Sequence, residues 1–173
     1  MKNRLFVTLS AILSSAAFFA GSASLAFAKE PKVLEFDAMI GVPRPYTGAT
    51  NAIRGVPGGG LPWVIHSGTG ELKASGKLEI DVVGLLIDPN DPAAIAAGRG
   101  GTNPSPNFKA IVSCLSKDAA GGPVTVNVST GLFPADAGGN SKIEDKVILP
   151  NPCIAPIIFV TSPAGSWFAA TGF

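Results

Sequence analysis

The sequence has 173 residues, with 13 lysines and arginines against 12 aspartates and glutamates, for a formal net charge of +1. The charges are scattered, so the chain lacks the basic patch or stripe that binding to nucleic acid requires. One histidine and two cysteines are too few to supply the three or four converging ligands of a zinc or copper centre. We therefore expect no nucleic acid partner and no cofactor.

Residues 1–28 have the pattern of a secretory signal peptide. Lys2 and Arg4 form a short positive region, an apolar run follows, and residues 26–28 give the A-x-A motif of a signal-peptidase site. A retained membrane anchor is the alternative, but small residues dilute the apolar run and no basic cluster follows it. We expect cleavage after residue 28, a single domain over 29–173, and a secreted or cell-envelope protein without a membrane span.

Short apolar runs separated by glycine and proline fill the rest of the chain. The chain contains 21 glycines and 15 prolines, and a proline inside a helix costs about 3 kcal/mol. Residues 78–83 and 124–129 alternate apolar and polar side chains with the period of two that is typical of half-buried strands. Further strands are predicted at 32–41, 61–67, 70–75, 107–116, 141–149, 154–162 and 166–173.

Eight or nine such strands predict an all-β fold, namely one β-sandwich of immunoglobulin-like or related Greek-key type. A small barrel is the alternative. One helical turn is expected near 92–97, since Asp91 can act as the N-cap, Pro92 suits the first helical position and Gly98 can end the turn. The apolar strand residues predicted to form the core are Leu78, Ile80, Val82, Ile111, Val124, Val126, Val128, Ile157 and Phe159.

The stretch GVPGGGLPWVIHSGTGELKASG, residues 55–76, holds three consecutive glycines, the single histidine and one of the two tryptophans. The glycines at 58–60 resemble a phosphate-binding loop in composition, but such a loop is followed by a helix, and the residues after 60 have an extended pattern. We instead expect residues 61–67 and 70–75 to pair as a hairpin across a short glycine-containing turn.

Cys114 and Cys153 both follow the signal segment, and two cysteines in an exported chain predict a disulfide. Closing a loop of about 40 residues would stabilise the fold by roughly 4 kcal/mol. Two buried thiols and a metal-binding pair are the alternatives.

His66 is the one histidine that could serve as a catalytic base. The chain has no G-x-S-x-G motif, and Ser67 should point away from His66 on a strand. We therefore expect a protein that is not an enzyme. The alternative is a small secreted hydrolase that uses His66 with a nearby carboxylate, which requires the two groups to lie within about 3 Å in a concave pocket.

Four residues are candidate ligand contacts: Trp63, Trp167, Tyr46 and His66. Exposed tryptophans can stack on sugar rings, and aromatic side chains anchor protein interfaces. These patterns favour a glycan or another surface protein as the partner. Packing of both tryptophans between the sheets is the competing interpretation.

Asp88, Asn90 and Asp91 form the one candidate calcium site, because calcium requires only oxygen ligands. The competing interpretation is that these residues, which flank prolines, form turns and caps.

Three blocks, IRGVPGGGLPWVI (53–65), GTNPSPNFKAIVSC (101–114) and LPNPCIAPIIFVTSPAGSWFAATG (149–172), resemble parts of a family of small exported bacterial proteins with no established function. The resemblance spans most of the chain after residue 28. It implies export, a bacterial source and a single domain, and it carries no site residues.

Overall fold

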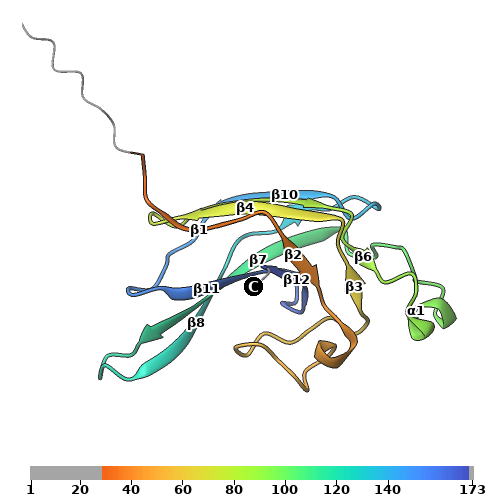
Figure 1. Ribbon diagram of the computed structural model, residues 1–173, viewed down its shortest axis with the longest axis horizontal. Helices are drawn as coiled ribbons and strands as arrows, with labels where there is room; N and C mark the ends of the chain where they lie inside the picture. Colours follow the sequence, from red (N-terminus) through yellow and green to blue (C-terminus); the bar gives the residue numbers. More distant parts are fainter. Residues whose placement is uncertain (1–28, 172–173) are drawn as a thin grey trace, which may run out of the picture.

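Two antiparallel β-sheets stack face to face, with the longer connections gathered at one end (Figure 1). The computed structural model describes residues 29–171, so the predicted signal peptide lies outside the described residues. The prediction of an all-β sandwich is confirmed. Its narrower assignment as immunoglobulin-like or Greek-key stays a prediction.

The first sheet contains four antiparallel strands in the order β1 (Lys32–Phe36), β4 (Ser67–Lys73), β5 (Lys77–Val83) and β10 (Ser141–Lys146). Apolar and charged residues alternate along these strands, so one face of the sheet is apolar and the other is charged. The apolar face is buried against the second sheet and contributes Leu72, Leu78, Ile80, Val82 and Ile143 to the core.

The second sheet has the order β2 (Met39–Gly41), β12 (Trp167–Thr171), β11 (Ile154–Thr161), β7 (Asn107–Lys117) and β8 (Pro123–Ser129), with β9 (Phe133–Pro134) paired to β7. A separate two-stranded ladder joins β3 (Trp63–Val64) to β6 (Leu86–Ile87). The helical elements are a 3-10 turn η1 (Arg44–Tyr46) and α1 (Pro92–Ala96).

The predicted hairpin between 61–67 and 70–75 is wrong. Strand β4 runs unbroken through Gly68 and Gly70, and it pairs with β5 on one side and β1 on the other. A side chain at Gly68 would overlap Met39, and one at Gly70 would overlap the backbone of β5. These glycines therefore permit close approach of neighbouring chain rather than a turn.

The strand predicted at 32–41 is divided between the two sheets. Residues 37–38 carry the chain from β1 in the first sheet to β2 in the second. Twelve strands result within residues 29–171, because this division and the short ladders add to the eight or nine that were predicted.

Most of the predicted core is buried, but the valines of β8 are an exception. Val124 is 37% exposed, and Val126 and Val128 are half-buried, as is Ile157 on β11. Strand β8 packs on β7 at the edge of the larger sheet and makes no comparable contact with the first sheet (Figure 1). Its alternation was identified from the sequence, but the sheet that would cover its apolar face does not extend that far.

Local predictions at α1 and at the cysteines are confirmed. The side chain of Asp91 accepts hydrogen bonds from the backbone N–H groups of Ala93 and Ala94 at 3.1 and 3.0 Å, and Gly98 has the positive φ of 63° that suits a helix end. Cys114 and Cys153 form a disulfide, which indicates an oxidising environment outside the cytoplasm. Neither helical element within residues 29–171 has the length and hydropathy to cross a membrane.

Candidate binding site

A long connection between β2 and β3, residues 42–62, folds back over the outer face of the second sheet. The glycine-rich part of this loop forms a short parallel bridge with the first residue of β12, Trp167. The N–H of Gly59 donates to the carbonyl of Trp167 at 2.8 Å, and the N–H of Trp167 donates to the carbonyl of Pro57 at 2.8 Å. The glycine triplet is thus a pairing segment of the loop.

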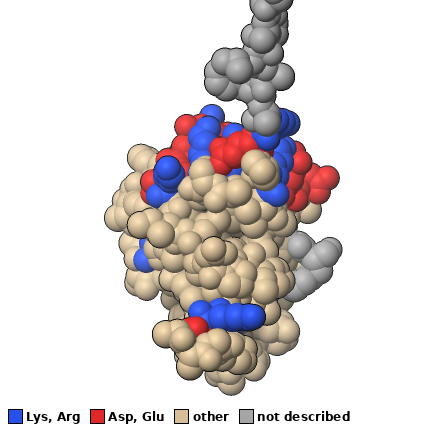
Figure 2. Space-filling view, turned by 90° about the vertical axis from the view of Figure 1, so that its left-hand side faces the viewer, with Lys and Arg blue, Asp and Glu red and all other residues tan. Residues whose placement is uncertain are grey.

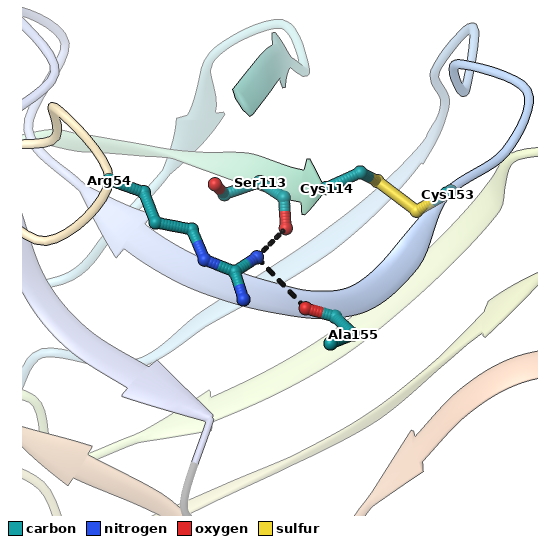
Figure 3. The surroundings of a disulfide bond; sticks show 5 residues. All are labelled: Arg54, Ser113, Cys114, Cys153 and Ala155. Atoms are coloured by element: carbon teal, nitrogen blue, oxygen red, sulfur yellow. Dashed lines mark hydrogen bonds between the residues drawn. A yellow bond between two sulfur atoms is a disulfide. The ribbon is translucent and has the colours of Figure 1, made fainter. Parts of the chain in front are cut away.

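Arg54 attaches the same loop to the sheet at a second point, beside the disulfide (Figure 3). Its Nη1 donates to the carbonyls of Ser113 at 2.9 Å and Ala155 at 2.8 Å. Ser113 directly precedes Cys114, and Ala155 lies two residues after Cys153. Those carbonyls are available because the register between β7 and β11 shifts at this position. A hydrogen bond from a charged donor is stronger than one between neutral groups, and these two hold the loop close to the sheet.

Between the loop and the sheet lies an apolar pocket of about 170 Å³. Six residues line it: Ile40, Pro43, Tyr46, Ile53, Trp167 and Ala170. We call it the Tyr46–Trp167 pocket. Trp167 is only 2% exposed, whereas Tyr46 and Ile40 are 41% and 50% exposed at the rim. The rings of Tyr46 and Trp167 have centroids 6.5 Å apart with a tilt of 55°, a favourable aromatic geometry.

A second, more open hollow of about 420 Å³ adjoins this pocket, since Ile40 and Pro43 line both. Trp63 lies in its wall, and Arg44 and Asp91 supply polar groups. Arg44 Nε donates to Asp91 Oδ2 at 2.9 Å, and Nη2 contacts the same carboxylate. The hydrogen bonds from Arg44 hold the pKa of Asp91 below its usual value.

The structure brings three of the four candidate ligand residues to these two hollows, in different roles. Trp63 is 5% exposed and stacks on Phe168 with centroids 3.8 Å apart, so both tryptophans belong to the core. Neither presents an open face to a sugar ring. Tyr46 is the aromatic candidate with an exposed ring.

His66 lies elsewhere. It is exposed in the bend before β4 and lines neither hollow. Within residues 29–171 its side chain makes no hydrogen bond to a carboxylate, which is the contact that the hydrolase alternative requires.

The predicted calcium ligands have structural partners. The carboxylate of Asp91 is occupied by Arg44 and by the first turn of α1, and Asp88 Oδ1 accepts from the N–H of Asn90 at 2.8 Å in a local turn. Across the described residues, no three His, Cys, Asp or Glu side chains are arranged to hold a metal ion. Turn formation and capping explain the contacts of these residues.

Sequence reasoning missed Ile40, Pro43 and Ile53 as lining residues, because it considered only aromatic and polar candidates. The sequence does carry one signal for Ile40. Met39 and Ile40 are adjacent apolar residues on a strand, so one of the two must face away from the sandwich interior.

The largest cluster of charged residues covers the outer face of the first sheet (Figure 2). Register places glutamates side by side on adjacent strands: Glu35, Glu71, Glu79 and Glu144. Lysines next to this row compensate its charge, since Lys32 and Lys73 both bind Glu71 at 2.8 and 2.9 Å. The hydrogen bonds from these lysines lower the pKa of Glu71 to about 2.

Acid should weaken the fold through this carboxylate. The pKa of Glu71 is lower in the folded chain than the ordinary 4.5, so its contribution to the free energy of unfolding is complete above about pH 4.5 and is lost as pH falls toward 2. Urea midpoints measured between pH 6 and pH 2 should decline in the wild type. The Glu71→Gln variant should show a smaller decline, and equal slopes would contradict this assignment.

Comparisons with protein families, with curated proteins and with solved structures returned no match to this chain.

Proposed function

We propose that this chain is an exported, non-catalytic binding protein that acts in the cell envelope or outside the cell, and that its Tyr46–Trp167 pocket receives one apolar side chain of a protein partner. The observation that supports this most is the pocket itself. It is apolar throughout, and the large side chains Ile40 and Tyr46 remain exposed at its rim. An apolar pocket with aromatic and aliphatic side chains at its rim can bury one apolar side chain of a partner.

The size of the pocket favours a side chain over a free small molecule. Its volume of about 170 Å³ lies below the range of roughly 300–1,000 Å³ that small-molecule sites span. Protein interfaces, in contrast, commonly centre on one aromatic or aliphatic anchor in a compact pocket with polar groups around it. Arg44 in the adjoining hollow supplies such a polar group, since its side chain is 51% exposed while Asp91 holds it in place.

Export is supported by two independent features. The signal-peptide pattern of residues 1–28 predicts it, and the Cys114–Cys153 disulfide is typical of oxidising compartments. A glycan partner has less support, because the two tryptophans that would stack on sugar rings are buried.

Peptides selected from a random displayed library against the secreted protein should carry an apolar anchor and bind at the pocket. Tyr46→Ala and Ile40→Ser should each weaken the affinity for such peptides about tenfold or more, because each removes part of the pocket wall. Ile148→Ala is the matched control, since Ile148 is an exposed apolar residue outside the pocket lining. Isothermal titration would measure the affinities.

Trp167 gives a direct report of pocket occupancy. In a Trp63→Phe background, which keeps a ring against Phe168, the remaining described tryptophan is Trp167 at the base of the pocket. Its emission should change on addition of a selected peptide. The proposal would be refuted if the emission did not change and Tyr46→Ala bound the peptides as tightly as the wild type. It would also be refuted if the protein bound no peptide but bound glycans on an array in a way that depends on Tyr46.

A further inference from the structure

Strand β8 forms an edge of the second sheet that carries no charge and no bulge, and its one protective residue is Pro123 at the very start of the strand. It is seven residues long, pairs only with β7, and lies at the outer margin of the molecule (Figure 1). No charged residue occurs between Asp118 and Asp136. Natural edge strands are normally kept short, bulged or charged, because an open edge is a template for a further strand.

The other three edges of the sandwich carry such protection. Strand β1 contains Lys32 and Glu35 and has an irregular register with β4. Strand β10 is charged at four of its six positions. Strand β2 is only three residues long. Among these four edges, β8 is therefore the one best able to pair with a further strand.

The hydrogen-bonding direction along β8 follows from its register. The N–H of Thr130 donates to the carbonyl of Ala110 at 3.0 Å, so alternate residues toward the start of the strand also bond to β7. The residues between them, Thr125, Asn127 and Ser129, therefore direct their N–H and C=O groups away from the sheet. Among residues 29–171, no backbone group pairs with that side of β8.

The side chains of β8 are complementary to themselves. In an antiparallel pairing of two β8 strands centred on Val126, valine faces valine on one side of the ladder, and Thr125 faces Asn127 of the other copy on the opposite side. The valines are also the apolar residues that the first sheet leaves partly uncovered. The strand carries no charged side chain that pairing would have to desolvate, whereas β1 and β10 both do.

We infer that two copies of this protein associate through antiparallel pairing of their β8 strands, which joins their larger sheets into one continuous sheet. The contact involves one short strand from each copy, which places it among small, weak interfaces. Dimerisation should accordingly depend on concentration, with a dissociation constant in the micromolar range or weaker.

The full chain, secreted and processed by its host, is studied by gel filtration coupled to light scattering. The measured mass should rise toward twice the monomer mass as the protein concentration increases from about 10 to 500 µM. Thr125→Lys introduces a charge on the edge, and Thr125→Pro removes an outward N–H without removing a bond to β7. Both variants should stay monomeric over this range. Thr102→Lys is the control, because Thr102 is an exposed threonine in the connection after α1.

Hydrogen exchange followed by NMR locates the contact. The amides of Thr125, Asn127 and Ser129 should exchange slowly at high concentration and rapidly on dilution, and circular dichroism should show that the Thr125 variants remain folded. A wild-type protein that is monomeric at 500 µM would overturn the inference, even if β8 were found to pair with a strand of a different protein. So would a dimer that persists in both Thr125 variants.

Discussion

Alanine at Gly58 is expected to destabilise the protein by about 3 kcal/mol or more, because a Cβ atom there would overlap the backbone carbonyl oxygen of Tyr46. Gly58 is also bonded to its surroundings through the backbone, since its N–H donates to the carbonyl of Gly48 at 2.9 Å. The loop must therefore move away from Tyr46 or lose its bridge to Trp167. Chemical denaturation would measure the loss in free energy of unfolding.

The same glycine triplet supplies the control. A Cβ atom at Gly60 would meet no heavy atom within 4 Å, and Gly60 does not have a positive φ. Gly60→Ala should therefore change stability by no more than about 0.5 kcal/mol, or stabilise slightly through the unfolded chain. Similar losses in the two variants would show that these glycines are needed for flexibility and not for close approach.

Removal of the disulfide by Cys114→Ala together with Cys153→Ala should cost about 4 kcal/mol, because the bond joins residues separated by 39 positions and restricts the unfolded chain. For a chain of this size, the melting temperature should fall by about 10 °C. Alanine is preferred to serine because Cys114 is fully buried, and a hydroxyl there would lack a hydrogen-bond partner.

Two comparisons test this interpretation. Reduction of the wild type should lower its melting temperature by a similar amount, and the reductant should have no effect on the double variant. Calorimetry would follow both. A double variant that melts within 2 °C of the wild type, a shift expected for about 1 kcal/mol or less, would contradict a major role for the bond.

The features that could be predicted from the sequence are those with a local physical cause. The alternation in 78–83 identified β5, the order Asp91-Pro92 identified the start of α1, and the cysteine pair identified the disulfide. Each depends on residues that are adjacent in the chain or on covalent chemistry that permits few options.

The errors arise where a distant neighbour decides the outcome. Gly68 and Gly70 suggest a turn on their own, but Met39 and the backbone of β5 approach them, so the strand continues. Val124 alternates correctly, yet it is exposed because the opposing sheet stops short of β8. The sequence contains no local signal for either neighbour.

The candidate site was predictable only in part, for the same reason. Tyr46 was identified by its residue type alone. The pocket beside it exists because Arg54 reaches carbonyls 59 and 101 residues further along the chain and draws the loop onto the sheet. Contacts at such separations are set by the folded topology and leave no pattern near residue 54.

The distribution of charge makes the two outer faces of the sandwich chemically different. The outer face of the first sheet is covered by neighbouring lysines and glutamates (Figure 2). Within residues 29–171, the strands of the second sheet carry only two charged residues, Lys109 and Lys117. Adsorption through the first face would require many ion pairs to lose their hydration. Under the proposed function, a partner bound at the pocket would therefore leave the ionic face of the first sheet toward the solvent.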